Sequence, residues 1–219
     1  MTTPGPHEAI LRTAAKANLV PLGMRQKGRS RTWFGDHGWW LAVVEFQPSS
    51  WSKGSYLNVA CMWLWYPQNH ISFNVCERMG SYAEFKDEES FRLAADKLAC
   101  LAAEGTLTNQ QRFQSINAAF EYLETEATGS QNPWDYHHAM MAALACRQVE
   151  RANDHLQSLL ALSPHADWCR DLQAHSKRIF AATVQTGNPE AVVAEQVALA
   201  RVRLALEPMR TLPWSAREA

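Results

Sequence analysis

The apolar positions in the first third of the chain follow strand patterns. Residues 39–66 read WWLAVVEFQPSSWSKGSYLNVACMWLWY, in which two apolar, aromatic-rich runs flank a break that contains Pro, Ser and Gly. This arrangement is typical of an antiparallel hairpin. It predicts strands over residues 39–47 and 56–66, and we expect this hairpin to be the centre of a sheet, with Trp63 and Trp65 together on the face that packs into the core.

Basic residues alternate in the segment that precedes the hairpin. Arg25, Lys27, Arg29 and Arg31 recur at every second position, so on a regular strand over residues 22–34 they point to one face. We call these four residues the basic comb. The opposite face of such a strand has little to bury, and Lys and Arg discourage edge-to-edge aggregation, so the pattern predicts an edge strand.

The remaining patterns complete an α+β protein. Residues 71–76 predict a fourth strand, and short loops favour an up-and-down antiparallel sheet of about four strands flanked by helices. After residue 82 the apolar period becomes helical. Helices are expected over residues 6–19, 87–105, 109–126, 133–144, 149–162, 166–185 and 189–207. The polar stretch TGSQNP at residues 128–133 predicts a boundary between an α+β domain (residues 1–128) and an all-α C-terminal region of about four helices (residues 129–219).

Composition excludes few function classes. The formal net charge of −1 gives no overall electrostatic case for binding nucleic acid or an anionic membrane. The charge is uneven, because residues 16–53 are basic and residues 77–126 are acidic, and we expect the two regions to attract each other within the fold. The five cysteines form no CxxC pair, and no signal-peptide or membrane-spanning run is present. These features predict a cytoplasmic protein with reduced thiols.

The first 126 or so residues resemble a family of bacterial proteins that is catalogued only as a domain of unknown function. The resemblance rests on a short helix followed by Leu22-Gly23-Met24-x-x-Lys27-Gly28, on Trp33-Phe34, and on the strand motifs Phe46-Gln47-Pro48-Ser49 and Tyr56-Leu57-Asn58-Val59, with an acidic helix start near Asp87. The helical tail lies outside it. The resemblance implies an α+β fold and no activity.

Polar side chains interrupt the central hairpin at one end. With the turn at residues 50–53, Gln47 faces Tyr56, Glu45 faces Asn58, and the four side chains share one face of the sheet. The basic comb is expected beside them. The interpretation stays open between a salt-bridged, solvent-facing sheet end, a ligand site and a catalytic site.

The candidate ligand-binding residues are therefore those of the polar sheet end, three residues of the comb and one loop tryptophan. They are Lys27, Arg29, Arg31, Glu45, Gln47, Trp51, Tyr56 and Asn58. Trp51 is included because an exposed aromatic ring in a loop is often a partner contact.

Three function classes follow from these patterns. The first is a non-enzymatic binding or protein-interaction module, whose partner is a protein or a small anionic ligand. The second is an enzyme that holds an anionic substrate with Lys27, Arg29 and Arg31 and uses Glu45 as acid and base. The third, nucleic-acid binding through the comb and Trp51, is disfavoured by the neutral net charge. No cofactor motif is present and the His and Cys spacings do not make a zinc site, so neither a cofactor nor a metal is expected.

Overall fold

The computed structural model describes residues 5–209, 212 and 214. This part of the chain forms one five-stranded antiparallel sheet and seven α-helices, and it confirms the α+β class. The chain divides into two compact units. The sheet unit comprises residues 1–63 and 71–111, and the helical unit comprises residues 64–70 and 112–219.

The sheet is an antiparallel meander in the order β1-β2-β3-β4-β5. Its strands are β1 (Arg25–Gln26), β2 (Thr32–Asp36), β3 (Trp40–Gln47), β4 (Gly54–Trp63) and β5 (Val75–Glu84). The central β3–β4 register is the predicted one, with Gln47 opposite Tyr56 and Glu45 opposite Asn58. A short polar loop between two long apolar runs leaves few alternatives, because a slip by one residue would turn the apolar side chains to the wrong face.

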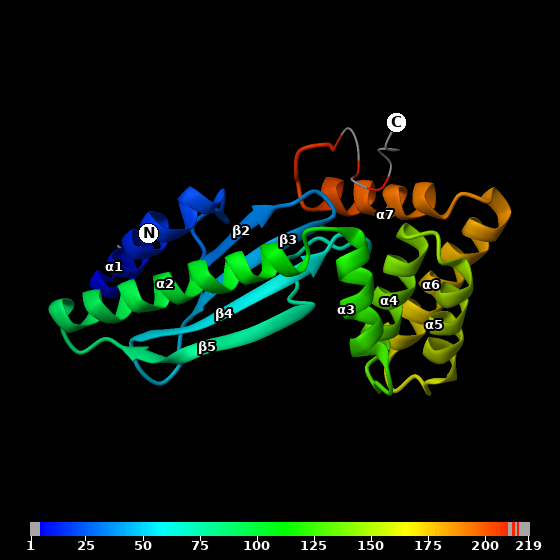
Figure 1. Cartoon of the computed structure of the whole chain (residues 1–219). Coiled ribbons are helices and arrows are strands. Elements are labelled where there is room, and N and C mark those ends of the chain that lie inside the picture. The colour runs from blue at the N-terminus through cyan, green and yellow to red at the C-terminus, as the bar shows by residue number, and fades with distance from the viewer. Residues whose placement is uncertain (1–4, 210–211, 213, 215–219) are drawn as a thin grey trace. The chain divides into compact units, whose positions relative to one another are not determined.

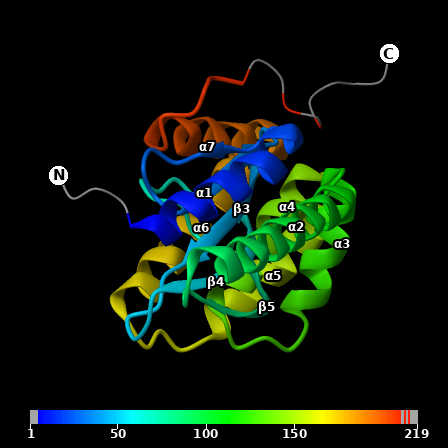
Figure 2. The same ribbon diagram turned by 90° about the vertical axis from the view of Figure 1, so that its left-hand side faces the viewer.

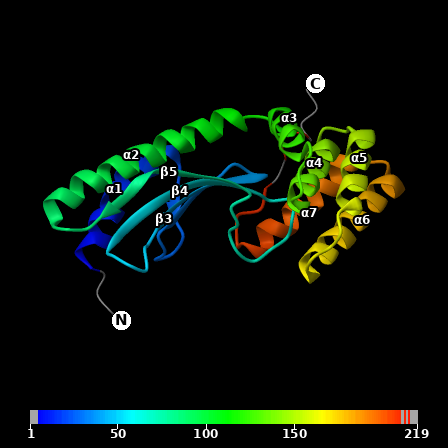
Figure 3. The same cartoon turned by 90° about the horizontal axis from the view of Figure 1, so that it is seen from below.

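Two helices cover one face of this sheet. Helices α1 (Pro6–Leu19) and α2 (Glu88–Arg112) lie across the same side of the strands in Figures 1 and 3, and next to each other in Figure 2. Cys100 of α2 lies 3.6 Å from the Oδ1 of Asn18 in α1, which confirms that the two helices are neighbours. We call the side that they cover the helix-covered face, and the other side the opposite face.

The basic comb does not lie along one strand. The chain turns at residues 27–31, where the amide of Lys27 donates to the carbonyl of Thr32 and Gly28 has a left-handed φ of 56°. The predicted strand over residues 22–34 is therefore two strands, β1 and β2, joined by a tight turn. Glycine adopts positive φ at little cost, so Gly28 allows this reversal within the alternating pattern.

The predicted fourth strand is also displaced. The strand after β4 begins at Val75 and ends at Glu84, so the expected strand over residues 71–76 contributes only its last two residues. Between β4 and β5 the chain leaves the sheet, and Leu64–His70 belongs to the helical unit. Trp65 is consequently buried in that unit and not on the sheet, where only Trp63 of the predicted pair lies.

Helix α2 continues through the glycine at which it was expected to end. A Cβ on Gly105 would lie 2.6 Å from the Sδ of Met79 and 3.1 Å from a methyl carbon of Val59. Gly105 therefore allows the helix backbone to approach β4 and β5 closely. It serves packing, and the helix continues to Arg112.

The helical unit is built around one central helix. Its helices are α3 (Ile116–Ala127), α4 (Pro133–Ala145), α5 (Val149–Ala161), α6 (Asp167–Thr186) and α7 (Pro189–Arg203). Helix α4 packs against the other four and is buried from His137 to Ala145. Such a helix is apolar on all sides, so periodicity alone does not show which side meets a partner.

In the division into compact units, α3 and Leu64–His70 belong to the helical unit, while the domain boundary after residue 128 stays a prediction. Whether the C-terminal region folds by itself stays a prediction. Across the described residues, no helix is long and apolar enough to cross a bilayer.

Candidate functional site

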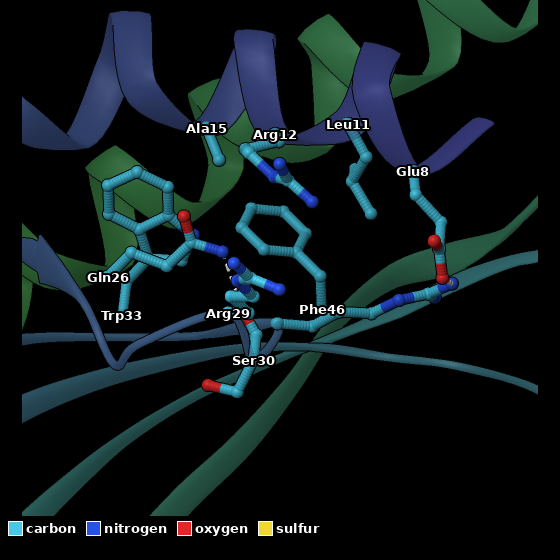
Figure 4. Close-up of a pocket in the computed structure, with 10 residues that line it drawn as sticks. Glu8, Leu11, Arg12, Ala15, Gln26, Arg29, Ser30, Trp33 and Phe46 are labelled. Carbon is cyan, nitrogen blue, oxygen red and sulfur yellow. Dashed lines mark hydrogen bonds and ion pairs between the residues drawn. The ribbon is translucent and has the colours of Figure 1, made fainter. Parts of the chain in front are cut away.

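A small pocket lies between α1 and the β1–β2 turn of the sheet unit. Figure 4 shows Arg12 reaching down from α1 and Arg29 reaching in from the turn, both toward the ring of Phe46. The apolar floor belongs to the helix-covered face of the sheet. The residues that line the pocket are Glu8, Leu11, Arg12, Ala15, Gln26, Arg29, Ser30, Arg31, Trp33 and Phe46. Its volume is about 50 Å³, which is the space of a few water molecules.

Positive charge exceeds negative charge in this pocket. Arg12, Arg29 and Arg31 face a single carboxylate, Glu8. Arg31 donates from Nη2 to the Glu8 Oε1 at 2.9 Å, and this hydrogen bond is the largest cause that lowers the pKa of Glu8. Glu8 is therefore ionised at neutral pH. The pocket lining therefore carries three guanidinium groups and one carboxylate, which is paired with Arg31.

Arg31 is held in place by several partners. Besides Glu8, its Nη1 donates to the carbonyl of Gly54 at 3.2 Å, and its Nη2 lies 3.4 Å from the Nε2 of His7. Burial, and then the charge of Arg31, lower the pKa of His7, so this imidazole is neutral at pH 7. A guanidinium fixed in this way presents its charge in one direction, which is the property that planar anion recognition uses.

The other two residues of the basic comb, Lys27 and Arg25, lie outside the arginine pocket. Lys27 sits in the β1–β2 turn, is exposed, and does not line the pocket. Arg25 lies over the Phe34 ring, 4.7 Å from its centroid, and Phe34 pairs with Val43 of β3. The turn therefore separates the comb, and Arg29 and Arg31 alone of its members reach the pocket.

The predicted polar sheet end exists as a hydrogen-bonded network on the opposite face. Asn58 donates from Nδ2 to Glu45 at 3.0 Å and to the Gln47 carbonyl oxygen at 3.3 Å. Arg78 of β5 donates to Asn58 and Gln47 and lies over the Tyr56 ring at 4.6 Å. The four predicted residues are thus brought together, with Arg78 as a fifth member.

The two groups of predicted residues form two separate places on the sheet unit. Val44 and Phe46 lie on the helix-covered face, and Glu45 between them points the other way. Glu45 does not line the arginine pocket. Glu45, which the enzyme hypothesis uses as acid and base, is therefore not among the residues that surround Arg29 and Arg31 in this pocket.

Trp51 marks a third feature of the sheet unit. It lies in the β3–β4 loop and is 94% exposed, so its ring packs on nothing in the described chain. The loop borders a hollow of about 320 Å³. Its lining residues are His7, Arg31, Pro48, Ser49, Ser50, Trp51, Ser52, Lys53 and Gly54. Arg31 thus lines both this hollow and the arginine pocket.

Histidines gather in the helical unit, but they make no metal centre. His137 and His138 are buried in α4, and His175 of α6 lies with its ring 5.8 Å from that of His137. Among the residues that the structure describes, no group of three or more metal-ligating side chains converges. His165 lies 3.6 Å from the Cys169 thiol without further ligands nearby in this part of the chain.

Sequence reasoning missed two of the arginines that matter. Arg12 comes directly after Leu11, which belongs to the buried apolar stripe of α1. A polar residue at the edge of such a stripe lies at the border of the surface that the helix covers. That signal was available. Arg78 lies beyond the expected end of the fourth strand, so no pattern linked it to Asn58.

No family model, no curated protein and no solved structure matches this chain.

Proposed function

We propose that the sheet unit is a non-enzymatic binding module that holds a small anionic group, such as phosphate, in the arginine pocket. One observation carries the proposal: three arginines line a pocket with a single carboxylate. Guanidinium groups bind phosphate and carboxylate through paired N–H donors. The small volume of the pocket favours an anionic group over a whole large ligand.

The geometry favours binding over catalysis. The carboxylate in the pocket, Glu8, accepts a hydrogen bond from Arg31 and has a lowered pKa, so it is a poor proton donor at neutral pH. The other candidate acid, Glu45, belongs to the network of Asn58 on the opposite face. A module that recognises an anion needs neither residue to transfer a proton.

The five free cysteines support a reducing, cytoplasmic location as part of this proposal. Three of these thiols are not buried: Cys76 and Cys100 are exposed and Cys146 is partly so. Such thiols persist most readily where the surroundings keep them reduced.

Titration of the whole chain with inorganic phosphate tests the proposal. We expect binding by isothermal titration calorimetry at low ionic strength, and a rise in thermal midpoint with phosphate, because a ligand that binds the folded state alone stabilises it. The variant Arg12→Gln with Arg29→Gln should lose most of this binding, since it removes two of the three guanidinium groups that line the pocket.

Lys16→Gln is the matched control. Lys16 lies one helical turn after Arg12 on α1, is exposed, and does not line the pocket. It should leave phosphate binding nearly unchanged. Equal loss in the control and in the double variant would show a diffuse electrostatic effect, and the pocket would then not be the site.

A further inference from the structure

The exposed tryptophan and the second hollow extend the cationic surface beyond the arginine pocket. Arg31 lines both cavities, and Lys53 and Trp51 line the hollow. No Asp or Glu lines the hollow among the described residues, and His7 is neutral because its pKa is lowered. The cationic residues of the two cavities are thus Arg12, Arg29, Arg31 and Lys53, and Arg31 is common to both.

Trp51 lines the hollow together with Arg31 and Lys53. A tryptophan ring that is 94% exposed leaves its whole face available to another flat group. The tip of the loop is otherwise made of Pro and Ser, so the ring is not part of an apolar patch that would insert into a lipid surface. An aromatic face beside a row of cations is the combination that single-stranded nucleic acids require.

We infer that this surface binds single-stranded nucleic acid, with phosphates along Arg29, Arg31 and Lys53 and a base stacked on Trp51. This inference rests on the proposed function, because it takes the anionic group of the arginine pocket to be a backbone phosphate. A strand accounts for cations distributed over two cavities, which one small anion would not fill. A duplex does not account for Trp51, because its base faces are already stacked.

Fluorescence anisotropy with a labelled oligothymidylate of about twelve nucleotides tests the inference, since single-strand sites span roughly 4–16 nucleotides. Stacking on one aromatic ring contributes enough that Trp51→Ala should weaken binding roughly 5- to 150-fold. Trp51→Phe should restore much of the affinity. Because the side chain is exposed, neither change should affect folding.

Salt dependence supplies a second measurement. The slope of log affinity against log salt should be about −2, from roughly 0.7 per phosphate contact over three contacts, and Lys53→Gln should reduce it by about 0.7. Lys97→Gln is the control, because Lys97 is an exposed residue of α2 that lines neither cavity. It should leave both slope and affinity unchanged.

Failure of this inference is distinguishable from failure of the proposed function. Phosphate titration of Trp51→Ala should match the parent, since Trp51 does not line the arginine pocket. If phosphate binds and the oligonucleotide does not, the inference is overturned and the binding module stands. Equal oligonucleotide affinity in the parent and in Trp51→Ala overturns it too. So does equal affinity for duplex DNA or for polyglutamate, which would point to charge alone.

Discussion

Acid should destabilise the helical unit because two imidazoles are buried in it uncharged. His137 places its Nδ1 2.8 Å from the Ser176 Oγ, and Ser176 in turn donates to the Leu172 carbonyl, so the imidazole is the donor and its Nε2 carries the lone pair. His138 accepts at Nδ1 from the indole N–H of Trp65. The Nε2 atoms of both histidines are buried and have no partner within the described chain.

Burial disfavours the charged form of both rings. It lowers the pKa of His138 to about 3, and it lowers the pKa of His137 well below its ordinary value of 6.5, where neighbouring histidines add to the effect. Above pH 6.5 the rings are neutral in both the folded and the unfolded chain. Below it the unfolded chain takes up protons and the folded chain does not, so stability falls as pH falls.

The loss of unfolding free energy depends only on the histidine pKa in the unfolded chain, as long as the pKa in the folded chain is well below the pH of the assay. Between about pH 7.5 and pH 5.5, each of the two histidines should remove about 1.4 kcal/mol of unfolding free energy, or about 3 kcal/mol together. His175, whose pKa burial lowers to about 4, acts in the same direction.

Urea denaturation followed by far-UV circular dichroism at the two pH values measures the loss. The variant His137→Asn with His138→Asn keeps a hydrogen-bonding group near each Nδ1 position and removes both titrations. It should be less stable at neutral pH, because asparagine fills less of the core. Its pH dependence should be smaller than that of the parent by about 3 kcal/mol. An unchanged pH dependence would show that these rings are hydrated or charged in the folded protein.

Two further predictions concern packing in the sheet unit. Trp63→Ala should cost roughly 3–5 kcal/mol in urea denaturation, because a ring that is 1% exposed and stacked on Trp39 leaves a cavity, and a loss below about 1 kcal/mol would contradict the burial. Gly105→Ala should destabilise by about 1 kcal/mol, since crowding of Val59 and Met79 costs roughly 1–3 kcal/mol and helix propensity returns at most about 1 kcal/mol. A raised thermal midpoint would show that the helix shifts away without strain.

The sequence was most informative where the apolar pattern was long. The β3–β4 register and the grouping of Glu45 with Asn58 follow from two apolar runs around one short loop. The pattern of residues 22–34 was misleading because alternation at period two is kept across a tight turn as well as along a strand. The reversal depends on the left-handed conformation of Gly28, and a glycine in a sequence permits that conformation without requiring it.

Other features depend on contacts that no local pattern records. Leu64, Trp65 and Tyr66 continue the apolar run of β4, yet Trp65 and Tyr66 pack with histidines of α4 and α6. The apolar pattern of the sequence indicates that such residues are buried, but it does not show whether they are buried in the sheet unit or in the helical unit. Gly105 is a similar case, because a glycine within a helical pattern marks either an end or a close approach, and the choice depends on Val59 in a distant strand.

The formal net charge of −1 does not show whether the protein can bind an anion, because binding depends on where the charges lie. Within the sheet unit, residues 1–63 carry seven Lys or Arg and three Asp or Glu, whereas residues 71–111 carry four and seven. The meander places β1 at one edge of the sheet and β5 at the other, so the β1–β2 turn with Arg29 lies at the edge away from β5. At physiological salt, exposed charges farther apart than about 8 Å are largely screened. An anion at Arg29 therefore responds to the arginines around it and not to the sum over the chain, which is why an almost neutral protein can present a cationic site.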